Sequence, residues 1–125
     1  MNESVPKPVD IKERAFKYSL RAIKLCQYLD KSSGNAGWIL SKQYLRSAAS
    51  IGANLEEAQA AESRADFAHK YTIALKEARE AIYWLKLISE SELVPKTKLA
   101  PLLKETEELA AIIGKIISNT KRRSR

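Results

Sequence analysis

The single histidine, His69, is the first side chain to consider for chemistry, because imidazole serves both acid–base catalysis and metal binding. Asp66 precedes it by three residues, which is the spacing of a carboxylate–imidazole metal pair on a helix. A di-iron site in a helical bundle needs two such pairs and further carboxylates, which one histidine does not supply. The sequence also lacks a glycine-rich phosphate loop, a Ser-His-Asp set and a Cys/His cluster. It therefore predicts no metal site and no cofactor.

Arg64 lies five residues before His69, and this R-x4-H spacing is similar to that of HEPN-type ribonucleases. In such enzymes Arg and His position and protonate a scissile phosphate. Residues five apart on a regular helix are about 140° from alignment, so we expect the two side chains to converge only across a dimer. His69 is expected to be a partly exposed residue at a helix contact. The sequence therefore predicts no catalytic residues, and a ribonuclease is kept as an alternative.

Basic residues dominate the two ends of the chain, whose formal net charge is +7. Those near the N-terminus fall within an arc of about 100° on a helix, opposite its apolar side, with one tyrosine among them and Glu13 interrupting. The members of this basic stripe are Arg14, Lys17, Arg21, Lys24, Tyr28 and Lys31. A basic tail follows at the C-terminus: Lys121, Arg122, Arg123 and Arg125. Together they predict binding to the phosphates of RNA or DNA, by shape and without base reading, or to an acidic protein.

A polar row lies between these basic segments. Its members step by four, four and three residues and so share one helix face: Arg46, Ser50, Asn54 and Glu57. Such a face is either solvated or an interface between subunits, and periodicity does not choose between the two.

Four amphipathic segments must position these residues. Period and punctuation predict helices over about 10–31, 37–61, 63–90 and 97–119. Asp10 and Ser63 are expected N-caps, with Asp66 closing a capping box on Ser63. Short connections favour an all-α fold, an antiparallel up-down-up-down four-helix bundle, as a single domain over residues 1–125. Residues 120–125 are expected to be a disordered tail.

Gly52 falls on the expected apolar side of the second helix, between Leu45 and Leu55. A glycine inside a helix costs about 1 kcal/mol relative to alanine, so a packing role is expected. We predict a notch at Gly52 that accepts Trp84 or Tyr83. Trp38 and Trp84 are expected to be core or interface anchors.

Composition bounds the remaining possibilities. The chain has 125 residues and one cysteine, Cys26, which excludes an internal disulfide and suggests a reducing compartment. No apolar run approaches the roughly 20 residues that span a membrane, and the N-terminus lacks the apolar region of a signal peptide. We expect a soluble, cytoplasmic protein with no membrane partner.

Residues 43–88 resemble the family named after proteins encoded in intervening sequences of 23S ribosomal RNA genes. The hallmark L-R-x-A-x-S-I-x-x-N-[IL]-x-E is matched by Leu45, Arg46, Ala48, Ser50, Ile51, Asn54, Leu55 and Glu57. A second segment, with Phe67 followed by A-L-K-E-A-x-E at residues 74–80, also matches. Many relatives have Glu-Gly where this chain has Glu57-Ala58, which affects the expected turn after the second helix.

The resemblance implies a non-enzymatic bundle that assembles into a homopentameric ring. A related branch, the accessory variability determinants of diversity-generating retroelements, implies RNA and a reverse transcriptase as partners. Three functions therefore remain in view: a nucleic-acid-binding module, with RNA favoured; a protein-interaction scaffold whose basic surface binds an acidic protein; and a ribonuclease.

Overall fold

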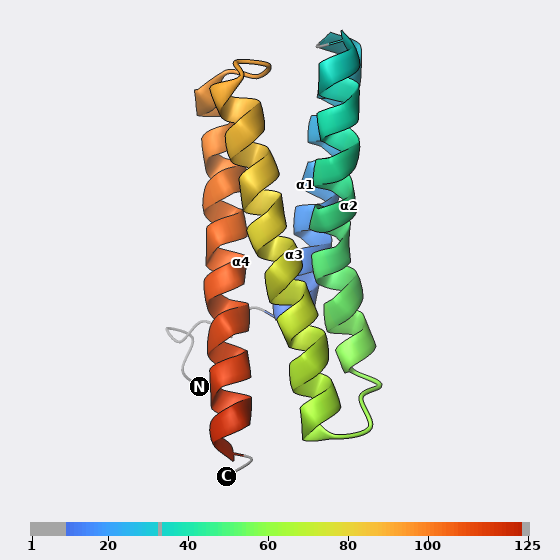
Figure 1. Cartoon of the computed structure of the whole chain (residues 1–125), viewed down its shortest axis with the longest axis vertical. Helices are drawn as coiled ribbons and strands as arrows, with labels where there is room; N and C mark the ends of the chain where they lie inside the picture. The colour runs from blue at the N-terminus through green and yellow to red at the C-terminus, as the bar shows by residue number, and fades with distance from the viewer. Residues whose placement is uncertain (1–9, 33, 124–125) are drawn as a thin grey trace, which may run out of the picture.

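A computed structural model describes residues 10–32 and 34–123, apart from the side chains of Lys31 and Ser32. These residues form four helices and no strand (Figure 1), which confirms the all-α prediction. The helices are α1 (Ile11–Ser32), α2 (Gly34–Ala58), α3 (Arg64–Glu90) and α4 (Lys96–Arg123). Most predicted bounds lie within three or four residues of these ends.

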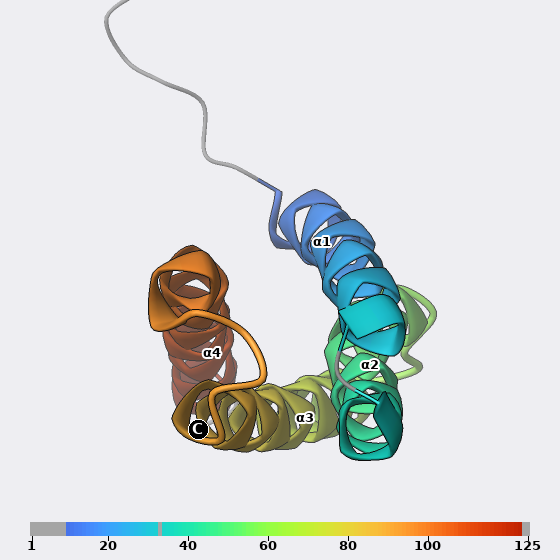
Figure 2. The same cartoon turned by 90° about the horizontal axis from the view of Figure 1, so that it is seen from above.

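The helices pack in chain order, and side-chain pairs show how α1 and α2 run. Ala15 lies against Gly52, whereas Cys26 donates its S–H to the carbonyl of Ser41 (3.3 Å). Residue numbers rise along one helix as they fall along the other, so the two are antiparallel. Viewed from the end in Figure 2, each helix lies beside the next, and α4 turns back toward α1. The seam between α1 and α4 is the most open of the four.

Local sequence sets the helix ends. Asp10 Oδ1 accepts the N–H of Lys12 (2.9 Å), and Ser63 Oγ accepts the N–H of Asp66 (3.0 Å), so both predicted caps are confirmed. The carboxylate of Asp66 reaches back to the N–H of Glu62 (3.3 Å), one residue before the predicted partner. Gly34 has φ +67°, a left-handed conformation open to glycine. The chain thereby turns within two residues, and α2 begins earlier than predicted.

The core confirms the predicted apolar sides of α1, α3 and α4 and corrects that of α2. Tyr44 and Ile51 are fully buried in α2, whereas Trp38 is 47% exposed with the Lys42 ammonium 4.0 Å from its ring centroid. Trp38 is therefore not a core residue, and its expected alternative role as an interface anchor stays a prediction. Cys26 is buried, and desolvation raises the pKa of its thiol to about 11.

The predicted notch at Gly52 is wrong. The glycine faces Ala15 on α1, and a Cβ added to it would lie 3.6 Å from the Ala15 Cβ, an ordinary contact. Tyr83, one of the two residues expected to fill the notch, is 59% exposed. Trp84 is half-buried and donates its indole N–H to Glu80 (3.3 Å).

A chain of hydroxyl groups crosses the core. Tyr44 donates to Tyr18 (2.8 Å), and the Tyr18 and Thr106 oxygens lie 2.6 Å apart. Thr106 donates to the carbonyl of Leu102 (2.7 Å), so Tyr18 must donate to Thr106. Each hydroxyl therefore gives its hydrogen in one direction, from α2 through α1 to α4. Burial raises the pKa of both tyrosines and keeps them neutral.

The ends of α4 differ from the prediction. The helix continues through Arg123, so residues 120–123 of the expected disordered tail are helical, while residues 124 and 125 lie outside the described residues. Pro101 lies five residues after the first residue of α4 and is exposed, so water can satisfy the Thr97 carbonyl that loses its partner.

Among residues 10–32 and 34–123, no helix is long and apolar enough to cross a membrane.

Candidate nucleic-acid interface

Three residues of the predicted basic stripe share a groove between α1 and α4. Arg21, Lys24 and Tyr28 are spaced three and four residues apart, which places them on one face of α1. The groove has a volume of about 380 Å³ and is lined by Arg21, Lys24, Leu25, Tyr28, Lys98, Leu99 and Leu102. None of these residues is acidic. We call this site the α1–α4 groove.

Lys98 completes the cationic rim of the groove from the opposite helix. Its ammonium lies 4.3 Å from the centroid of the Tyr28 ring, a cation–π contact. Neither Arg21 nor Lys24 forms an ion pair with any residue in the described part of the chain. The groove therefore concentrates three positive charges above an apolar floor, and it suits an anion.

The rest of the basic stripe is arranged differently. Arg14 binds Glu105 with two hydrogen bonds of 2.7 Å and Glu108 with one of 3.1 Å. Its hydrogen bonds to Glu105 raise the pKa of the Arg14 guanidinium further above its ordinary value. Lys17 pairs with Glu13 (3.1 Å) in the exposed turn below. The side chain of Lys31 lies outside the described residues. The positive charges of Arg14 and Lys17 are thus neutralised by carboxylates.

The outermost face of α1 is apolar, whereas the sequence predicted it to be basic. Phe16, Leu20 and Ile23 are 65%, 48% and 41% exposed, and they lie about 140–160° around the helix from the buried Tyr18. We call them the α1 apolar face. The arginines of the stripe lie instead toward α4, because Arg14 and Arg21 are about 40–60° from Tyr18 on that side.

A second exposed apolar group lies on α2 and α3: Trp38, Ile39, Tyr83 and Leu87. Arg46 pairs with Glu80 across the antiparallel helices, so Ile39, seven residues earlier, lies level with Leu87, seven residues later. We call Ile39, Tyr83 and Leu87 the α2–α3 apolar face. Sequence analysis missed both faces, although the four- and three-residue spacing of Phe16, Leu20 and Ile23 was a detectable signal.

The basic tail joins α3 at the opposite end of the bundle from the α1–α4 groove. Arg64 donates from Nη1 to the carbonyl of Arg123 (2.8 Å), and Arg122 donates to Asn119 Oδ1 (2.8 Å). A hollow of about 420 Å³ beside them is lined by Arg64, Phe67, Ile116, Asn119, Thr120 and Arg123. Lys121, Arg122 and Arg123 are all exposed. Arg125 lies outside the described residues.

Arg64 and His69 line the same groove within one chain, although the guanidinium of Arg64 is bonded to the carbonyl of Arg123. This groove, of about 370 Å³, is lined by Arg64, Ala65, Ala68, His69, Thr120 and Lys121. Arg64 is the first residue of α3, and its long side chain extends toward the end of α4, so an angle calculated from Cβ positions does not apply. His69 is exposed.

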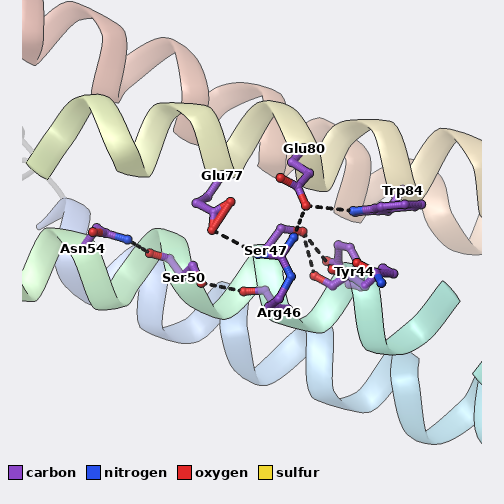
Figure 3. A network of polar contacts seen from close by, with 9 residues as sticks. Tyr44, Arg46, Ser47, Ser50, Asn54, Glu77, Glu80 and Trp84 are labelled. Atoms are coloured by element: carbon purple, nitrogen blue, oxygen red, sulfur yellow. Dashed lines mark hydrogen bonds and ion pairs between the residues drawn. The ribbon is translucent and has the colours of Figure 1, made fainter. Parts of the chain in front are cut away.

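The polar row forms contacts within its own chain (Figure 3). Arg46 pairs with Glu77 (3.6 Å) and with Glu80 on α3. Ser50 donates to the carbonyl of Arg46 (2.7 Å) and Asn54 to that of Ser50 (2.8 Å), while Glu57 is exposed. Glu77 and Glu80 belong to the A-L-K-E-A-x-E segment. The two sequence motifs that carry the family resemblance therefore meet in one cluster.

No group of three or more His, Cys, Asp or Glu side chains in the described residues is arranged to hold a metal ion. The fold and the α1–α4 groove thus define an all-α helical-bundle protein with an exposed cationic groove. The family model for the 23S rRNA-intervening sequence protein matches residues 7–115, and the chain belongs to this family. The resemblance found in the sequence is confirmed.

A solved structure from Bacteroides thetaiotaomicron VPI-5482 has the same fold. It is described as a protein with unknown function from the S23 ribosomal protein family. Its TM-score is 0.82 at 36% sequence identity, and the match covers 86% of this chain and 98% of that chain. Curated proteins give no significant match. The family is one of unknown function and is not a known enzyme family.

Proposed function

We propose that this protein is a non-catalytic, self-associating helical bundle that binds nucleic acid, and RNA is the favoured partner because of the family resemblance. The α1–α4 groove carries the proposal: Arg21, Lys24 and Lys98 line one hollow whose lining contains no carboxylate. Elsewhere the chain pairs Arg14, Lys17, Arg46 and Lys96 with Glu residues. A cationic site without acidic neighbours attracts phosphate. The exposed tail at Lys121–Arg123 lies at the opposite end of the bundle and would offer a second, separate group of phosphate contacts.

Self-association is supported by the two apolar faces, and the family resemblance favours a homopentamer. The α1 apolar face and the α2–α3 apolar face lie on different helices, so each can pack against the other on a neighbouring copy. An interface between two different surfaces forms a ring when its repeated rotation closes and an open filament when it does not. A ring would also repeat the α1–α4 groove in every subunit and convert weak phosphate contacts into avidity.

The oligomer is tested by measuring molar mass in solution. Leu20→Lys and Tyr83→Lys each place a charge on one apolar face, and either one should shift the mass toward the monomer. Lys104→Gln on the exposed side of α4, away from both apolar faces, is the control and should leave the mass unchanged. A wild-type monomer at high protein concentration would contradict self-association.

Nucleic-acid binding is tested by fluorescence anisotropy with labelled RNA and the matching DNA at about 50 and 200 mM salt. Neutralising Arg21 and Lys24 with Gln should weaken binding and reduce its salt dependence, because two phosphate contacts are lost. The pair Lys76→Gln and Lys86→Gln removes the same charge from exposed positions on α3 and is the matched control. Equal losses in both pairs, or binding that ignores salt, would contradict the α1–α4 groove as the site.

The contribution of the tail is measured in the same assay. A chain shortened by residues 121–125 loses four basic groups. Its RNA affinity should fall below that of the full chain, and this difference should be larger at low salt than at high salt because salt screens exposed charges. If RNA binding is absent and an acidic protein such as a reverse transcriptase binds instead, the protein-interaction scaffold replaces this proposal.

RNA cleavage is a second candidate function, favoured by one observation: Arg64, His69 and Lys121 line a single groove. Arg and Lys can hold a phosphate while His transfers a proton to or from the reacting oxygens. Cleavage of RNA that disappears in both Arg64→Ala and His69→Ala would establish a nuclease. Activity that survives both substitutions would come from another source and remove this candidate.

A further inference from the structure

The α1–α4 groove contains more than a phosphate requires. Its floor is made by Leu25, Leu99 and Leu102. Leu99 and Leu102 are only 2% and 6% exposed, so the half-buried Leu25 supplies most of the apolar surface that a ligand could reach. Arg21, Lys24 and Lys98 form the rim. A phosphodiester backbone alone gains nothing from leucine side chains, whereas a ligand with an apolar plane and an attached anion matches both parts.

Tyr28 supplies an aromatic surface at the same place. It lines the groove, and its side chain is 39% exposed. The Lys98 ammonium lies over its ring at 4.3 Å, so one long side chain of the rim covers the ring face on the α4 side. A nucleobase stacked on that face would take the position of the ammonium and leave Lys98 to pair with the adjoining phosphate.

From these contacts we propose that the α1–α4 groove binds one unpaired nucleotide, with its base between Tyr28 and the leucine floor and its phosphates on Arg21, Lys24 and Lys98. The ligand class is therefore a single-stranded nucleic acid, and RNA is taken from the proposed function. This inference rests on the proposed function and narrows it. In a duplex the bases are stacked and paired inside the helix, and they cannot enter a hollow between two protein helices.

The test compares three labelled RNAs of equal length by fluorescence anisotropy: a single strand, the same strand with abasic sites, and a duplex. Wild-type protein should bind the single strand at least about tenfold more tightly than the other two, since base stacking on an aromatic side chain is lost in both. Tyr28→Ala should reduce single-strand affinity to the abasic level. Tyr28→Phe keeps the ring and should bind like wild type.

A second readout separates stacking from a change in fold. A 2-aminopurine base in the strand should lose fluorescence on binding wild type and Tyr28→Phe, but not on binding Tyr28→Ala. Thermal unfolding of the three proteins checks that each is folded. Equal affinity for single strand and duplex, with steep salt dependence, would refute the nucleotide site while leaving nucleic-acid binding intact. No binding to any RNA would refute both proposals.

Discussion

The seam between α2 and α3 and the seam between α1 and α4 use charge in opposite ways. In the first, Arg46 meets two carboxylates, Glu77 and Glu80, both from the neighbouring helix. The second is divided. Arg14 meets Glu105 and Glu108 at one level, and two turns farther along α1 the basic residues at the groove rim have no carboxylate among their lining neighbours.

The difference separates charge that holds helices together from charge that is presented outward. Arg14 is held by three hydrogen bonds with side-chain exposures of 23% and 17% for it and Glu105. Arg46, with 53% side-chain exposure, is closer to solvent. Both differ from Arg21 and Lys24, which form no ion pair with a described residue. Basic residues of one predicted stripe thus pair with carboxylates at one end and form no ion pair with a described residue at the other.

The largest effect is expected at the buried hydroxyl chain, which crosses the core from α2 through α1 to α4. Tyr18→Phe leaves Tyr44 without an acceptor and Thr106 without a donor, so the free energy of unfolding should fall by about 2–3 kcal/mol. Urea unfolding measures the loss. Tyr44→Phe removes only the first donor and should cost less, about 1 kcal/mol. Equal losses would contradict the assigned direction.

Arg14→Ala tests the part of the α1–α4 seam in which Arg14 pairs with Glu105 and Glu108. It leaves Glu105 half-buried without its guanidinium, and we expect a loss of about 2 kcal/mol, in the range of charged hydrogen bonds. Lys17→Ala removes an exposed pair from the same helix and serves as the control, with a loss below about 0.5 kcal/mol. If both variants unfold alike, Arg14 does not hold the seam.

Gly52→Ala tests the α1–α2 seam, which depends on small side chains rather than charge. The added Cβ meets Ala15 at an ordinary distance, so the higher helix propensity of alanine should stabilise the protein by up to about 1 kcal/mol. Gly114→Ala, with nothing within 4 Å of its Cβ, should gain a similar amount. Destabilisation at residue 52 alone would restore the predicted notch.

Arg46→Ala tests the α2–α3 seam, and its expected effect is smaller than that of Arg14→Ala. Because Arg46 is more than half exposed, solvent screens its pairs, and the loss should be about 0.5 kcal/mol. A double-mutant cycle with Glu77→Ala measures the coupling directly. A coupling above that of Arg14 with Glu105 would reverse the order of the two seams.

Lys98→Glu should place a carboxylate in the α1–α4 groove, as Glu105 already does beside Arg14 at the other end of the same seam. The new carboxylate faces Arg21 and Lys24 across an exposed groove, so stability should change by less than about 0.5 kcal/mol. RNA affinity should nevertheless fall at least about tenfold, because the charge of the groove drops by two. A stable variant with unchanged RNA affinity would exclude the groove as the binding site.

Sequence periodicity predicted the helices and most of the core because apolar residues of α1, α3 and α4 recur with a clear helical spacing. It failed in α2, where the buried side contains small residues such as Ser41, Ser47 and Ala48. Small residues give little contrast between buried and exposed faces. The apolar side predicted for α2 therefore included Trp38 and missed Tyr44 and Ile51.

The candidate site was predictable only as far as it lies on one helix. The shared face of Arg21, Lys24 and Tyr28 follows from their spacing. Lys98 and Leu99 lie about seventy residues later, and Glu105 lies 91 residues from Arg14. Which residues meet across a seam depends on how far one helix slides along another, and no local pattern records that. The predicted roles of these residues in binding stay predictions.

Arg64 closes the last turn of α4 from outside that helix, through its bond to the carbonyl of Arg123. The final turn consequently owes its shape to another part of the chain. A synthetic peptide of residues 96–123 should fray at its end even where the whole protein does not. The rate of trypsin cleavage after Lys121 would then report how often α3 detaches from the end of α4.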